Sequence, residues 1–158
     1  ISIHLERPSV DQLVTRKLTD YRLSLYASRA YLDRNPPIEK REDLAAHAWI
    51  DYVDDLLFSQ ELKFLSSFCR NPKVVFHSTS VIAQHQAARS GLGIAVLPCF
   101  MAASDPDLVA LLPGEGIQRS YWISSRRELH KSVRLRVLWD YVVELCAREQ
   151  PLLLGESG

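Results

Sequence analysis

The stretch KVVFHSTSVIAQHQAARSGLGIAVLP, residues 73 to 98, decides the fold class of this chain. It predicts a strand over Lys73–His77, a helix over Val81–Ser90 and a second strand over Gly93–Leu97. The second strand has no polar side chain, which is typical of a parallel strand that is covered on both faces of its sheet. Because one helix joins the two strands, we expect them to be parallel neighbours with a right-handed crossover.

The same alternation of strands and helices continues on both sides of this stretch. Further strands are predicted over residues 1–6, 14–26, 48–52, 108–112 and 118–124. Further helices are predicted over residues 29–34, 42–46, 60–69 and 132–148. Strands that alternate with helices indicate an α/β fold with a mixed or mostly parallel sheet.

The longest predicted helix, Ser132 to Arg148, has a polar stripe at i, i+4 spacing, formed by Arg136, Asp140, Glu144 and Arg148. Its main apolar face is expected to contain Leu135, Leu138, Tyr141, Val142 and Leu145. Trp139, Val143 and Cys146 are expected to lie beyond that face. A broad apolar surface usually has a partner, and we therefore expect a homodimer or a higher oligomer.

Composition limits the possible classes of function. The chain has 158 residues, of which 47% are hydrophobic and 24% charged, so a globular protein is expected. Its 19 basic and 19 acidic residues balance, which argues against strong binding of nucleic acid by this chain. The three cysteines, Cys69, Cys99 and Cys146, form no C-x-x-C pair, and this pattern fits a reducing cytoplasm. No apolar run is long enough to span a membrane, and no signal peptide is recognisable.

Ser78, Thr79 and Ser80 are the candidate binding residues, because they lie between a predicted strand and a predicted helix. The unpaired N–H groups and the positive dipole end at a helix start favour a carboxylate or another anion. The same residue types also cap helices, and capping and binding can coexist. His77 precedes the cluster and is a further candidate, since ligand sites prefer the carboxyl ends of strands.

Patterns that would carry catalysis, a metal or a nucleotide are not found. Gly91-Leu92-Gly93 follows a helix and precedes a strand, which is the reverse of a dinucleotide-binding loop, and fits a helix end instead. The five histidines form no H-E-x-x-H motif, and no G-x-S-x-G motif occurs. We therefore expect neither an enzyme nor a metal or cofactor site.

Several segments, in order, resemble the effector-binding domain of LysR-type bacterial transcription regulators. They are Ile3-His4-Leu5-Glu6-Arg7-Pro8; Leu23-Ser24-Leu25-Tyr26-Ala27-Ser28; Ser78-Thr79-Ser80 with Ala87-Ala88-Arg89-Ser90-Gly91-Leu92-Gly93-Ile94-Ala95-Val96-Leu97-Pro98; Leu108-Val109 to Pro113 with Tyr121-Trp122; and Val133-Arg134-Leu135-Arg136. Each piece is weak alone, and the ordered set is specific.

The resemblance implies two α/β subdomains joined by two crossing strands, similar to the type II fold of periplasmic binding proteins. Residues 18–118 would form regulatory subdomain II, and residues 1–17 with 119–158 a partial subdomain I. The helix-turn-helix domain of the family and the opening elements of subdomain I have no counterpart in the sequence. The chain is therefore interpreted as truncated on its N-terminal side, with one lobe complete and the other partial.

The resemblance also implies a function, which is sensing of a small-molecule effector, anionic if the cap cluster binds it. In the family, the helix start that matches Ser78–Ser80 touches the effector. DNA would be bound only through the absent helix-turn-helix domain, and a homodimer in the cytoplasm is expected. Two alternatives remain open: a periplasmic-type solute-binding protein, and a small enzyme on the same two-lobed fold.

Overall fold

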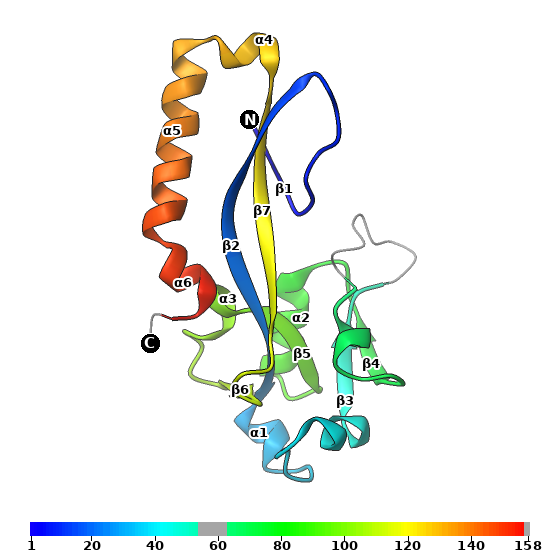
Figure 1. Ribbon diagram of the computed structural model, residues 1–158. Coiled ribbons are helices and arrows are strands. Elements are labelled where there is room, and N and C mark those ends of the chain that lie inside the picture. Colours follow the sequence, from blue (N-terminus) through cyan, green and yellow to red (C-terminus); the bar gives the residue numbers. More distant parts are fainter. Residues whose placement is uncertain (54–62, 157–158) are drawn as a thin grey trace. The chain divides into compact units, whose positions relative to one another are not determined.

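The computed structural model describes residues 1–53 and 63–156, and the chain divides into two compact units (Figure 1). Unit 1 consists of Ile1–Tyr21 and Gln118–Gly158, and unit 2 consists of Arg22–Ile117. Two long strands belong to both units: β2 (Leu13–Ser28) passes from unit 1 into unit 2, and β7 (Ile117–Arg126) begins as the chain returns to unit 1. The corresponding boundaries expected from the sequence lie at residues 17/18 and 118/119.

Unit 2 is built on a mixed sheet in the order β2-β5-β3-β4, with β6 also paired to β2. Its further strands are β3 (Ala48–Asp51), β4 (Lys73–His77), β5 (Ile94–Pro98) and β6 (Leu108–Leu111). β3 is parallel to both β4 and β5, whereas β2 is antiparallel to β5 and β6. Every residue of β5 is buried, as its apolar sequence predicted.

The expectation that β4 and β5 are neighbours is wrong, because β3 lies between them. Trp49 and Ile50 of β3 are almost fully buried, and a central place in the sheet covers both of their faces. β4 alternates between exposed and half-buried residues, which suits the end of the sheet. Gly93 permits the close approach of β5 to β3, since a Cβ at this position would lie 2.5 Å from the Ala48 carbonyl oxygen.

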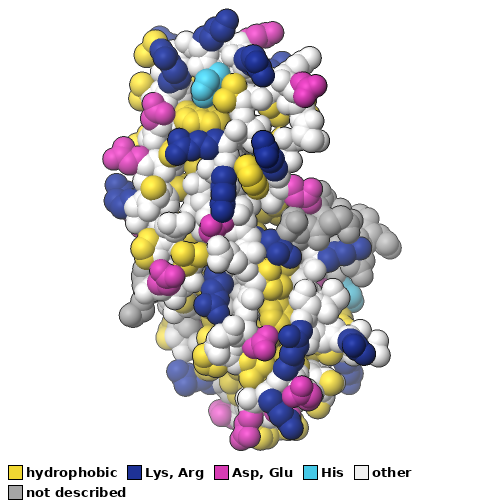
Figure 2. Space-filling model, viewed as in Figure 1, with side chains coloured by type: hydrophobic (Ala, Val, Ile, Leu, Met, Phe, Trp, Pro, Cys, Tyr) yellow, Lys and Arg dark blue, Asp and Glu magenta, His cyan; other side chains and the backbone are white. Residues whose placement is uncertain are grey.

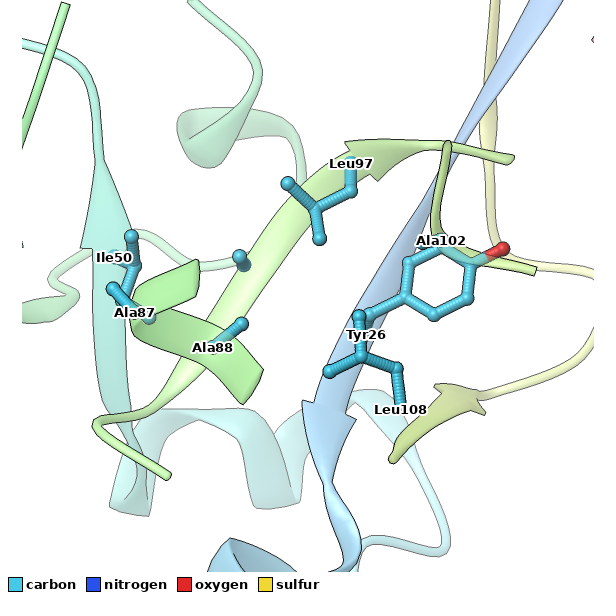
Figure 3. Close-up of a cluster of buried hydrophobic side chains, with 8 residues drawn as sticks. Tyr26, Ile50, Ala87, Ala88, Leu97, Ala102 and Leu108 are labelled. Carbon is cyan, nitrogen blue, oxygen red and sulfur yellow. The ribbon is translucent and has the colours of Figure 1, made fainter. Parts of the chain in front are cut away.

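Helix α2 (Val81–Arg89) connects β4 to β5 and contributes Ala87 and Ala88 to the main apolar cluster of unit 2. Figure 3 shows these two alanines beside Ile50 of β3, with Leu97 and Tyr26 further along the cluster. The helix ends in a Schellman motif, in which the amides of Leu92 and Gly91 donate to the carbonyls of Ala87 and Ala88. Gly91 has a φ of +80°, a left-handed conformation that favours glycine.

Short helices complete unit 2. They are α1 (Arg29–Leu32), the 3₁₀ helices Arg41–Ala46 and Leu65–Ser67, and α3 (Cys99–Ala102). Ser28 caps α1, and its hydroxyl accepts a hydrogen bond from the Tyr31 amide. The helix predicted over residues 60–69 lies partly outside the described residues, and its described part contains only the second 3₁₀ helix.

Unit 1 contains β1 (Ser2–His4), which pairs antiparallel with β7, and β7 in turn pairs with β2. Its helices follow β7 in the chain: α4 (Arg127–His130), α5 (Val133–Arg148) and α6 (Gln150–Leu154). Within the described residues, we find no helix with the length and apolar character that crossing a membrane requires.

The expected division of α5 into a main apolar face and a lateral one is wrong. Trp139 is its one buried residue, and its ring meets the ring of His130 edge-on, with centroids 4.9 Å apart. Leu138 and Tyr141, which were expected on the main face, are instead 51% and 60% exposed. The spacing alone could not distinguish the faces, because both are apolar; the large Trp139 ring and its contact with His130 decide which one turns inward.

Candidate functional site

The four predicted site residues lie together, where β4 ends and α2 begins. The Ser78 amide donates to the carbonyl oxygen of Asp51 at the end of β3, over 3.0 Å. The side-chain amide of Gln84 donates to the Ser78 carbonyl oxygen, also over 3.0 Å. The connection between strand and helix is thus held both by the neighbouring strand and by the first turn of α2.

Ser78 and Ser80 act as capping residues. The Ser80 hydroxyl accepts a hydrogen bond from the Ala83 amide over 3.4 Å, and the Ser78 hydroxyl accepts one from the Ser80 amide over 3.1 Å. Among the described residues, the amides of Val81 and Ile82 have no acceptor. Two backbone donors therefore remain for water or a ligand, as is usual at a helix start.

Thr79 is exposed, and its hydroxyl forms no hydrogen bond with another described residue. The ring of His77 is also exposed, and its Nδ1 lies 3.1 Å from the Tyr52 carbonyl oxygen, to which it can only donate. None of the residues 77–80 carries a permanent positive charge. An anion at this position would therefore be held by N–H and O–H donors and by the helix dipole.

Sequence reasoning missed two supports of this site, the end of β3 and Gln84. β3 was predicted as a strand, but its position beside β4 was not, so the carbonyls of Asp51 and Tyr52 were not expected here. Gln84 is only 1% exposed. An amide among the apolar residues of α2 was a signal that could have been read, because a buried amide requires a hydrogen-bond partner.

Two other histidines of unit 2 are buried in polar clusters away from the solvent. The Tyr31 hydroxyl accepts a hydrogen bond from the Ala48 amide over 2.9 Å and shares another with His47 Nδ1 over 3.1 Å. Burial lowers the pKa of His47, and the charge of nearby Asp43 opposes this only in part. His85 Nε2 lies 3.2 Å from an Asp105 carboxylate oxygen. Both contacts join segments distant in the sequence, as expected of structural histidines.

No cluster of three or more His, Cys, Asp or Glu side chains within the described ranges could hold a metal ion. In unit 1, a hollow of about 440 Å³ is lined by Asp11, Gln12, Arg126, Arg127, Glu128 and Lys131. All six residues are exposed and their charges are mixed. Such a mixture of exposed charges is typical of a solvated surface.

The sequence matches a known protein family. A model of the LysR substrate binding domain matches residues 1–147. The chain belongs to this family. The expected resemblance is thereby confirmed, and with it the role of a regulatory, effector-sensing domain of a LysR-type transcription regulator. Such domains are parts of regulators rather than enzymes, and nothing in the comparisons supports the solute-binding or enzymatic alternatives.

Solved structures confirm the fold of this LysR substrate-binding domain. The regulatory domain of CrgA from Neisseria meningitidis is 22% identical, with a TM-score of 0.73, over 90% of this chain and 73% of that chain. The regulatory domain of CcmR from Synechocystis PCC6803, in complex with 2-PG, is 23% identical, with a TM-score of 0.69, over 90% of this chain and 71% of that chain. Both likenesses support the expected α/β fold of the type II periplasmic-binding class.

The chain spans half the length of a full-length regulator. Full-length AphB from Vibrio cholerae is 21% identical, with a TM-score of 0.70, over 90% of this chain and 50% of that chain. No curated protein matches the sequence.

Proposed function

We propose that this LysR substrate-binding domain binds a small anionic effector at the start of α2, through Thr79 and the donors around it. The observation that carries the proposal is the set of unused donors there, namely the Thr79 hydroxyl and the amides of Val81 and Ile82. His77, Ser78 and Ser80 complete the proposed site as residues that shape it. The complex of the CcmR regulatory domain with 2-PG supports a small ligand for a domain of this fold.

Occupancy of the site would act on DNA through a separate helix-turn-helix domain of the full regulator. This chain has no surplus of basic residues, with 19 of each sign. On the face drawn in Figure 2, Lys and Arg side chains are spread among Asp and Glu rather than gathered in one patch. The proposal includes a cytoplasmic homodimer, as expected for the regulators of this family, and effector binding that shifts the balance between two arrangements.

Substitution of Thr79 by Val tests the site. It removes one exposed hydroxyl and keeps the shape of the side chain, so stability should hardly change. The probe is a panel of small carboxylates and phosphates that includes 2-PG and inorganic phosphate, titrated by calorimetry. For the compound that binds the unaltered chain most tightly, we expect Thr79→Val to bind about tenfold more weakly. This corresponds to the loss of one hydrogen bond to a charged group.

Ser90→Ala is the matched control, because Ser90 is also exposed but lies at the other end of α2, where the dipole is negative. It should leave the affinity unchanged. Equal affinities in Thr79→Val and the unaltered chain would overturn the assignment of the site, and equal losses in both variants would show that the effect is not specific to the helix start.

A further inference from the structure

Two neighbouring residues of α2, Gln84 and His85, are buried although both are polar. A buried polar side chain lowers stability unless it finds a hydrogen-bond partner, so each of these positions needs one. The partner of Gln84 is the Ser78 carbonyl oxygen, close to the start of the helix. The partner of His85 lies in a different part of unit 2.

His85 contacts the loop between α3 and β6. Its Nε2 lies 3.2 Å from an Asp105 carboxylate oxygen, and the two side chains are only 11% and 9% exposed. Within the described part of the chain, no other group forms a hydrogen bond with Nε2. The side-chain amide of Gln86 lies 3.5 Å from Nδ1 and can donate to it, which leaves the proton of the neutral ring on Nε2, facing the carboxylate.

Asp105 is held in turn by its own loop. Its other carboxylate oxygen accepts a hydrogen bond from the Asp107 amide over 3.0 Å. The Asp107 carbonyl oxygen accepts one from the amide of Arg29, which follows β2 directly in the chain, over 3.2 Å. The next element after the loop is β6, which pairs with β2. The carboxylate that faces His85 therefore has a fixed place relative to β2 and β6.

Helix α2 is thus attached to two parts of the sheet through two buried polar residues. Gln84 connects it to Ser78, whose amide is bonded to the end of β3, and His85 connects it to the loop before β6. The donors proposed for the effector lie in the first turn, and Val81 is about 6 Å from His85 along the axis at 1.5 Å per residue. A shift of α2 would move these donors, and a binding site tolerates displacements of only about 0.5 Å.

We propose that His85 and Asp105 are positioning residues of the effector site: their contact fixes the place of α2 on the sheet, and with it the amides of Val81 and Ile82. The inference rests on the proposed function, because it concerns the same site. Neither side chain touches the effector. A buried polar pair adds little stability compared with apolar residues of the same size, but it can select one arrangement of the elements that it joins.

Two substitutions of His85 test the proposal by calorimetry, with the same panel that includes 2-PG and inorganic phosphate. His85→Leu fills the space but removes the donor, so we expect binding about fivefold weaker, a usual size for changes that act without touching the ligand. In His85→Gln, the side-chain nitrogen can take the place of Nε2, so the affinity should be retained. Urea denaturation shows whether both variants are folded. Unchanged affinity in His85→Leu would overturn the proposal, and so would an equal loss in both variants.

Asp105→Ser tests the same contact from the loop and needs no ligand. The serine hydroxyl can still accept the Asp107 amide in the turn, but the shorter side chain does not reach His85. The backbone amide resonances of Val81 and Ile82 in the ligand-free chain should therefore move in a ¹H–¹⁵N NMR spectrum. Resonances that stay in place would overturn the positioning role, whether or not any compound of the panel binds.

Asp107→Ser is the matched control, because it removes the same charge from the same loop. Asp107 pairs with Arg89 over 2.8 Å, but its side chain is 55% exposed, and an ion pair at the surface contributes little. The two amide resonances and the affinity should both stay unchanged, and equal shifts in Asp105→Ser and Asp107→Ser would contradict the role of the buried pair. Resonances that move only in Asp105→Ser, in a chain whose binding ignores Thr79→Val, would overturn the effector site and leave the positioning of the helix start intact.

Discussion

The two units differ in how many of their apolar side chains they bury. In unit 1, the buried hydrophobic residues are Tyr21, Ile123 and Trp139, whereas all the others in the described chain lie in unit 2. The exposed large hydrophobic residues show the reverse: only Val75, Ile82 and Leu92 belong to unit 2, and the remainder belong to unit 1. Unit 2 buries most of its apolar side chains in a core of its own, while unit 1 leaves more of them exposed.

This difference matters for function. A binding site needs rigid support, and the proposed effector site lies on unit 2, where α2 and β3 are both anchored in the apolar cluster. Most of the exposed large hydrophobic residues, by contrast, lie on unit 1. The proposed site therefore belongs to the unit with the larger buried core.

The largest expected effect is on the free energy of unfolding, and it distinguishes buried from exposed apolar residues. Leu97 of β5 is 0% exposed within the cluster of unit 2, and Leu97→Ala should lower the free energy of unfolding by about 3 kcal/mol, through lost burial and the cavity left behind. Val137→Ala, at a position of α5 that is 65% exposed, should change it by less than about 0.5 kcal/mol. Urea denaturation followed by circular dichroism measures both, and similar losses would contradict the difference between the units.

The sequence predicted most elements of unit 2, because local signals and tertiary packing agree there. The capping serines, the Schellman glycine Gly91 and the apolar strand β5 each bear a signal that can be read within a few residues. The order of the strands could not be read in this way. The position of β3 between β4 and β5 depends on contacts between distant segments, such as that of Gly93 with Ala48.

In unit 1, the sequence predicted that α5 exists but not which face turns inward. The inner face of an amphipathic helix can be predicted when one side is apolar and the other polar. In α5 this difference in polarity is small, because Trp139 and Tyr141 are both apolar and lie on different sides. Of the proposed site, the four residues were identified from their place between strand and helix. Their support by Gln84 and the carbonyl of Asp51 was not, because it depends on the strand order.

A smaller effect on stability is expected from pH, and it should arise from a residue of unit 2. Burial lowers the pKa of His47 below its ordinary value of about 6.5. As pH falls below that value, the unfolded chain gains a proton on His47 that the folded chain does not yet take up. Stability is therefore fully present above about pH 6.5 and is lost as pH falls toward the lowered pKa of the folded state.

Substitution of His47 isolates this contribution. His47→Gln keeps a polar side chain but cannot be protonated, so its stability should depend less on pH between about 6.5 and 5. Thermal unfolding at several pH values measures the difference. His130→Gln in unit 1 is the comparison, since the His130 ring is only half-buried and shares a hydrogen bond with the Ser125 hydroxyl. If the pH dependence persisted unchanged in His47→Gln, another group would be responsible for it.

The smallest effect compares the first turns of the longest helix in each unit. In unit 2, the Ser80 hydroxyl accepts a hydrogen bond from the Ala83 amide at the start of α2. In unit 1, α5 begins after Ser132, whose side chain forms no such bond. Ser80→Ala should therefore lower the free energy of unfolding by about 0.5–1 kcal/mol, whereas Ser132→Ala should leave it nearly unchanged. Both serines are exposed, so the two substitutions differ mainly in the capping bond, and urea denaturation of the two variants side by side would resolve the difference. Equal losses would mean that Ser132 also caps its helix in solution, and the start of α5 would then be as well fixed as that of α2.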